Sequence, residues 1–191
     1  MIAPFLFGKL PAHGDFVQRG LGDATRDAWD AACAAMLERA RADLGDAFED
    51  AHDQAPPWRF VCGPSSLGAD WRAGALAPSV DSAGRRFLLV LGLDGLSSAE
   101  AQALGHGAAV GCEAAIYQVF AEALDADGAF AAVRGLAEGL SAGETRDAEL
   151  QSLWWALDAE GAQADQIASA ELPSDLLLRT FTTVTPPERV Q

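Results

Sequence analysis

Two short segments carry most of the side chains that could do chemistry. Each segment follows an apolar stretch that is typical of a strand, and loops at strand ends are where binding and catalytic groups concentrate. If the two strands are neighbours in a sheet, both sets of side chains meet at one edge of it. The residues are Lys9, His13 and Asp15 in the first segment, and Ser79, Asp81, Arg85 and Arg86 in the second.

Two kinds of functional site, a hydrolase active site and a metal site, could be built from these residue types. A hydrolase needs a nucleophile, a base and an orienting carboxylate, which Ser79, His13 and either Asp15 or Asp81 would supply; however, the GxSxG turn that presents an activated serine is missing from the sequence. A metal site could use His13, Asp15 and Asp81, but their spacing matches no known ligand pattern.

A structural role is the interpretation we favour for the two aspartates. Asp15 and Asp81 are expected to form partly buried pairs with Arg85 or Arg86, or to accept hydrogen bonds from backbone N–H groups, and so to hold both loops. A phosphate-binding loop is excluded, because Lys9 is followed by Leu-Pro instead of a helix start.

Lys9 is the only lysine among 13 basic residues. A preference for arginine explains the other positions but not this exception. Lysine is a compact point charge where arginine is a planar fork, so Lys9 is a candidate site residue; the alternative is a chance lysine on a solvated loop. Because surface exposure is expected, Lys9→Arg should leave folding intact, and if Lys9 is a site residue it should weaken function or partner binding more than Arg41→Lys.

The remaining histidines and the cysteines indicate no further site. His52 lies in an acidic segment and is expected to be exposed, and His106, between two glycines, is expected to be structural. Cys33, Cys62 and Cys112 lack the short spacing of a metal knuckle or redox motif and are predicted to be buried free thiols. The sequence therefore predicts no metal and no cofactor.

Hydrophobic periodicity predicts an α/β protein. Apolar residues at helical spacing, from Trp29 to Leu44, predict an amphipathic helix that Asp23 or Thr25 could cap and Gly45 could end. Residues 87–93 are nearly all apolar and predict a central strand buried on both faces. The predicted strands are 2–7, 58–62, 71–76, 87–93 and 150–157, and the predicted helices 24–44, 98–124, 127–138 and 174–181; 46–57 and 77–86 are predicted as connections.

The short link between strands 58–62 and 71–76 favours an antiparallel pair. Because strands and helices interleave without strict alternation, we expect a mixed, partly antiparallel sheet with helices on both faces. The chain is interpreted as a single domain over residues 1–184, followed by a frayed tail at 185–191.

Composition excludes several classes of function. The chain has 191 residues, of which 50% are hydrophobic, with a mean hydropathy of +0.07; no apolar run is long enough to span a membrane and no signal peptide is evident. A net charge of −15 disfavours nucleic acid and anionic membranes as partners, whereas a basic partner protein is compatible with it. We expect a cytoplasmic protein.

Several ordered blocks give the chain a family resemblance. The run FGKLPAHGDFV (Phe7 to Val17), APPWRF (Ala55 to Phe60), PSVDSAGRRF (Pro78 to Phe87) and a late SLWW resemble the TagF family, also called ImpM, of type VI secretion-associated proteins. Two positions bear on the match: Leu88 stands where proline is expected, and His13 stands at a variable position, which argues against a catalytic histidine.

The resemblance implies a cytoplasmic post-translational regulator, usually a repressor, of type VI secretion assembly. It also implies a link to a threonine phosphorylation pathway, contact with a forkhead-associated (FHA) scaffold protein, a single three-layer α/β/α domain and no enzyme activity. The alternative is a small-molecule binder or hydrolase that uses Lys9, His13, Asp15, Asp81 and Arg85. The matching positions predicted to bind a partner or to structure the loops are Lys9, Pro11, Gly14, Asp15, Phe16, Pro78, Ser79, Asp81, Gly84 and Arg85.

Overall fold

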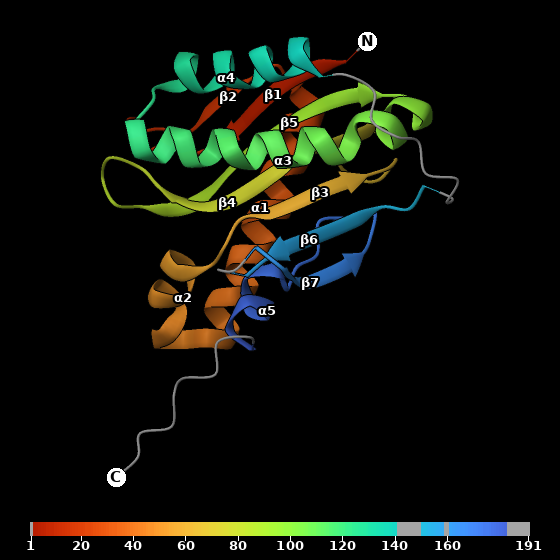
Figure 1. Ribbon diagram of the computed structural model, residues 1–191. Helices are drawn as coiled ribbons and strands as arrows, with labels where there is room; N and C mark the ends of the chain where they lie inside the picture. Colours follow the sequence, from red (N-terminus) through yellow and green to blue (C-terminus); the bar gives the residue numbers. More distant parts are fainter. Residues whose placement is uncertain (1, 141–149, 159–160, 183–191) are drawn as a thin grey trace.

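The computed structural model describes residues 2–140, 150–158 and 161–182, and it consists of one seven-stranded sheet with helices on both faces (Figure 1). The sheet order is β2-β1-β5-β4-β3-β6-β7. The strands are β1 (Ala3–Gly8), β2 (Val17–Arg19), β3 (Trp58–Cys62), β4 (Trp71–Val80), β5 (Arg86–Leu96), β6 (Leu153–Leu157) and β7 (Gln163–Ala168).

The α/β class is confirmed, but the prediction of a mixed sheet is wrong, because every neighbouring pair of strands is antiparallel. β4 and β5 are joined by a tight turn, which requires antiparallel strands. The mixed sheet was inferred from the interleaving of predicted strands and helices, and the two helices after β5 fit that pattern without joining parallel strands. They instead lead the chain to the far side of the sheet, where β6 pairs antiparallel with β3.

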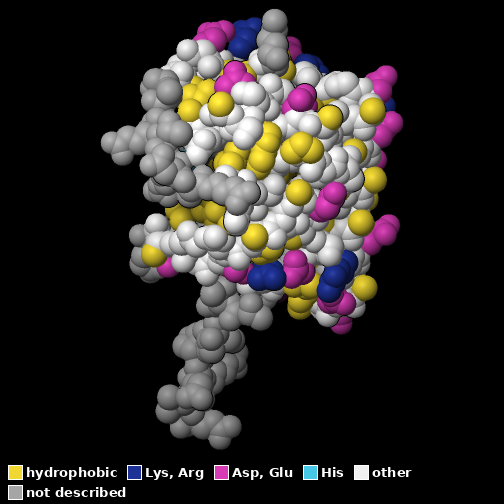
Figure 2. Space-filling model, turned by 90° about the vertical axis from the view of Figure 1, so that its right-hand side faces the viewer, with side chains coloured by type: hydrophobic (Ala, Val, Ile, Leu, Met, Phe, Trp, Pro, Cys, Tyr) yellow, Lys and Arg dark blue, Asp and Glu magenta, His cyan; other side chains and the backbone are white. Residues whose placement is uncertain are grey.

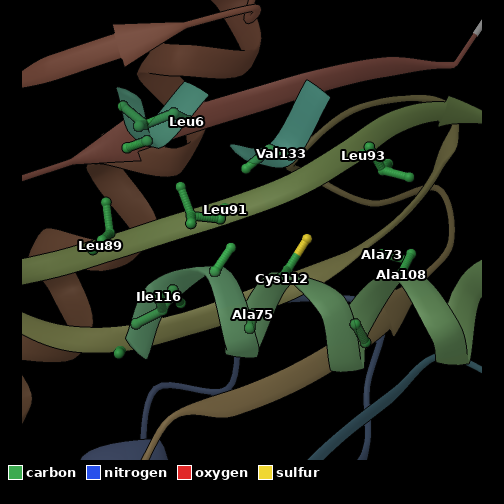
Figure 3. Packing of buried hydrophobic residues seen from close by; sticks show 14 of the residues in the cluster. Leu6, Ala73, Ala75, Leu89, Leu91, Leu93, Ala108, Cys112, Ile116 and Val133 are labelled. Carbon is green, nitrogen blue, oxygen red and sulfur yellow. The ribbon is translucent and has the colours of Figure 1, made fainter. Parts of the chain in front are cut away.

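Two hydrophobic clusters lie on opposite faces of the sheet, and β5 contributes to both. Leu89, Leu91 and Leu93 pack against α3 and α4, as Figure 3 shows, whereas Leu88 and Val90 face the cluster of α1, α2 and α5. The prediction of a central strand buried on both faces is confirmed. The helices are α1 (Asp23–Leu44), α2 (Phe48–Gln54), α3 (Ser98–Glu122), α4 (Ala126–Gly139) and α5 (Leu176–Thr182), with a 3₁₀ turn at Gly45–Ala47.

The ends of the long helices follow local sequence rules with one exception. The predicted apolar stripe of α1 is buried, and Gly45, with φ of +54°, ends the helix. The residue before the helix is Gly22, and no side chain caps it, so the predicted cap by Asp23 or Thr25 is wrong. Ser97 caps α3 through a reciprocal capping box with Glu100.

Glycine allows α4 to pack closely on α3. A Cβ at Gly111 would lie 2.5 Å from Leu136 of α4, so the absent side chain makes room for the leucine.

Along the part of the chain that the structure describes, no helix combines the length and apolar character needed to cross a bilayer.

Three elements lie outside the predicted ones. α2 forms within the segment predicted as a connection. Its Phe48 is buried in the hydrophobic cluster on the α1 side of the sheet, which stabilises a helix too short to persist alone. β2 and β7 lie at the two edges of the sheet. Their partly exposed sequences carry little hydrophobic alternation, so only the pairing with β1 and β6 reveals them. The predicted tail at 185–191 lies outside the described residues.

β4 continues past Pro78 to Val80, so the predicted end of this strand at residue 76 is wrong. β3 begins at Trp58, opposite Leu76. The last part of β4 therefore has a neighbouring strand on one side only, where a missing N–H is tolerated.

Candidate functional site

Asp81 opens the turn between β4 and β5, and its carboxylate is the centre of the site. Oδ1 accepts hydrogen bonds from the backbone N–H groups of Ala83 and Arg85, both at 2.9 Å, the pattern by which aspartate builds a tight turn. Oδ2 accepts from Lys9 Nζ and from Arg85 Nε, each at 2.7 Å. Four donors thus satisfy a residue that is only 3% exposed.

Lys9 is fixed through three of its atoms. Its N–H donates to the carbonyl of Leu88 at 3.0 Å, its carbonyl accepts from the hydroxyl of Ser79 at 2.8 Å, and Nζ holds Asp81. A Cβ at Gly8, where φ is +123°, would overlap the Leu88 carbonyl, so glycine is required for β1 to lie this close to β5. Lys9 is 7% exposed; the expectation of a solvated loop lysine is wrong.

The charges around Asp81 favour its ionised form. Lys9 is the largest influence, and the side chain and N–H of Arg85 add to it, so the pKa of Asp81 is held well below its usual range although burial acts in the opposite direction. The ionised carboxylate therefore stabilises the turn at neutral pH.

The loop between β1 and β2 is attached to the same turn. Arg85 Nη2 donates to the carbonyl of Gly14, and the N–H of Ser82 donates to the carbonyl of His13 at 2.9 Å. The ring of His13 points elsewhere: its Nε2 accepts from the N–H of Ala126, at the start of α4, at 2.9 Å. One loop thus ties the β4–β5 turn to α4.

The expected pairing of both aspartates with Arg85 or Arg86 holds only for Asp81 with Arg85. Asp15 is exposed and forms no ion pair with any residue that the structure describes. Phe16 is 48% exposed and packs edge-on against Phe87, with ring centroids 4.5 Å apart.

A second charged group, built around Arg86, could not be recognised from the sequence. Arg86 donates to Asp53 at 2.7 and 2.9 Å and lies 3.1 Å from Glu49. It lowers the pKa of Asp53 to about 2, aided by His52. His52 is 1% exposed and its Nε2 donates to the Phe87 carbonyl at 2.7 Å, so the prediction of an exposed histidine is wrong. The one sequence signal for this charged group was the four-residue spacing of Glu49 and Asp53, which places both on one face of α2; that helix was not predicted.

The candidate nucleophile and base, Ser79 and His13, are bound to different partners. The hydroxyl of Ser79 is bound to the Lys9 carbonyl, whereas His13 is bound to Ala126, so Ser79 and His13 do not form a hydrogen-bonded pair. Within the described ranges, no three His, Cys, Asp or Glu side chains are placed to hold a metal ion. Burial raises the pKa of the Cys62 and Cys112 thiols to about 12, and all three cysteines are buried and unpaired as predicted.

The loops joined at Asp81 are the first and third blocks of the family resemblance. A family model described as "TagF N-terminal domain, Type VI secretion system-associated" matches residues 6–138, which include both. The chain belongs to the TagF family. A separate comparison with curated proteins found no match.

A solved structure has the same fold as this TagF chain. The crystal structure of PA0076 from Pseudomonas aeruginosa PAO1 superposes with a TM-score of 0.72 at 23% sequence identity, covering 100% of this chain and 98% of that one. At this identity the likeness supports the fold and nothing further.

Proposed function

We propose that this TagF protein is a cytoplasmic, post-translational repressor of type VI secretion assembly that acts by binding an FHA scaffold protein of the secretion system. The observation that carries the proposal is the family match over residues 6–138. Two features of the chain are compatible with it. Lys9 and Asp81 form an ion pair with each other inside the fold. The surface is acidic, with carboxylates spread over the side drawn in Figure 2.

A binding role, without catalysis, agrees best with the site. The small-molecule or hydrolase alternative needs Lys9 and Asp81 to face a ligand, but both are buried and satisfied by one another. His13, its base, is turned toward the start of α4. No specific observation favours that alternative.

Two measurements test the proposal. Purified chain should bind the purified FHA scaffold in isothermal titration calorimetry, and deleting the chain from its native host should raise secretion by the type VI system. Replacement with Arg134→Lys, a conservative change at an exposed position of α4, should restore repression. Unchanged secretion after deletion, together with no heat of binding to the scaffold, would rule the proposal out.

A further inference from the structure

The three sequence blocks that carry the family resemblance meet at one groove. The first block supplies Pro11, the second supplies Ala55 and Pro57, and the third supplies residues 78–80 of β4. These residues are far apart in the chain, and only the fold brings them together. We call this hollow, whose volume is about 340 Å³, the β4-edge groove.

β4 presents an unpaired edge to this groove. β3 begins at Trp58, and the two residues before it, Pro56 and Pro57, have no N–H with which to continue a ladder. The β3–β4 pairing therefore stops at Leu76, while β4 runs on to Val80 against β5.

Within the ranges that the structure describes, the hydrogen-bond pattern shows which backbone groups have no partner there. The N–H of Asp81 donates to the carbonyl of Arg85 at 3.2 Å, which makes them a bonded pair of the hairpin. Bonded and non-bonded pairs alternate in an antiparallel ladder. Val80 lies one position before Asp81 and Pro78 three positions before it, so both are in non-bonded pairs with β5. The backbone N–H and carbonyl of Val80 and the carbonyl of Pro78 therefore point away from β5, toward the groove.

The walls of the groove are apolar. Tyr117 and Phe120, three residues apart on α3, form one wall. Phe120 is partly buried against the core, whereas Tyr117 is 54% exposed, more than any other large hydrophobic residue that the structure describes. These backbone groups lie beside aromatic and proline side chains, an arrangement that can bind an extended peptide as an added strand of the sheet. Main-chain hydrogen bonds hold such a peptide, and its alternate side chains enter apolar pockets.

The charge of the groove is negative. Among its described lining residues, Asp53 is the one with a formal charge, and Arg86, which pairs with it, also faces Glu49. This group of three side chains keeps a net negative charge, within a protein of net charge −15. A segment that carries Lys or Arg beside its apolar residues is complementary to it.

We propose that the β4-edge groove binds an extended apolar segment, flanked by Lys or Arg, from a partner protein, and that this segment pairs with Val80 and Pro78 as a short added strand. The inference rests on the proposed function in one respect, that the partner is a protein.

Photo-crosslinking in the native host tests the groove without assuming the partner. Tyr117→benzoylphenylalanine places the reactive group at the groove, and Val110→benzoylphenylalanine places it at another exposed apolar position of α3 as the matched control. We expect fragmentation mass spectrometry to find the Tyr117 adduct on an apolar segment next to Lys or Arg. Adding Val80→Pro, which removes the free N–H, should lower its yield roughly tenfold.

A second pair of variants leaves the backbone unchanged. Unlabelled Tyr117→Ala should compete for this crosslink roughly tenfold less well than unlabelled Val110→Ala. Equal competition, a yield at Tyr117 no higher than at Val110, or an adduct on a segment without an apolar stretch overturns the inference. An adduct of the expected chemistry on a protein outside the secretion system supports the groove and overturns the proposed function instead.

Discussion

The buried carboxylate of Asp81 should matter far more to stability than an exposed one. Asp81→Ala leaves Lys9 buried without its counter-ion, and breaking a buried pair costs about 3–5 kcal/mol. Asp43→Ala removes a half-exposed carboxylate 3.5 Å from Arg39 and should cost about 0–1 kcal/mol. Urea denaturation at neutral pH measures both free energies of unfolding.

Asp43 is the appropriate control because Asp53, although exposed, is bound to Arg86 and His52. Similar free energies of unfolding for Asp81→Ala and Asp43→Ala would show that the four hydrogen bonds to Asp81 do not stabilise the folded protein.

The pKa of Asp81 also predicts how its contribution depends on pH. Because the folded state holds this pKa below its unfolded value of about 3.9, the stabilisation is fully present above that value and is lost as the pH falls toward the folded pKa. The difference in unfolding free energy between wild type and Asp81→Asn should therefore shrink between about pH 4 and about pH 2. Urea titrations at several pH values measure it, and a constant difference would contradict this account.

Lys9 is buried, so replacing it with arginine should now be destabilising. Nζ lies 2.7 Å from Asp81 in a site that is 7% exposed, and the wider guanidinium must displace its neighbours. Overpacking of this kind costs about 1–3 kcal/mol, whereas Arg134→Lys, at an exposed position, should change stability by less than about 0.5 kcal/mol. Thermal melts compare them; an unchanged melting temperature for Lys9→Arg would restore the view of Lys9 as a solvated residue.

Among the elements, α3 depends on its capping box. Ser97 accepts from the N–H of Glu100 while the Glu100 carboxylate accepts from Ser97 N–H and hydroxyl. Ser97→Ala should cost about 1 kcal/mol, and Ser98→Ala, one residue further along, should cost less than about 0.5 kcal/mol. Chemical denaturation distinguishes the two serines, and equal losses would mean that the cap does not stabilise α3.

For the whole molecule, a net charge of −15 predicts a stability that rises with salt. Repulsion among exposed carboxylates disfavours the compact state, and salt screens exposed charges more strongly than the buried pair at Asp81. The melting temperature should increase as sodium chloride is raised from about 0.05 to about 0.5 M. A decrease would indicate that exposed ion pairs contribute more than the net repulsion removes.

The amino-acid sequence by itself determined the features that depend on neighbours in the chain. The apolar stripe of α1, the doubly buried strand β5 and the Ser97 cap follow from periodicity and from residues within one or two helical turns. The pairing of Asp81 with Arg85 belongs here too, because the partners are four residues apart.

Only the tertiary structure decided the features that depend on distant pairing. Lys9 meets Asp81 across 72 residues, and whether that lysine is buried depends on the antiparallel register of β1 and β5. The burial of His52, the all-antiparallel sheet and the unpaired edge of β4 likewise depend on which strands become neighbours. Strand neighbours are chosen by the packing of the whole core, and no local pattern specifies that choice.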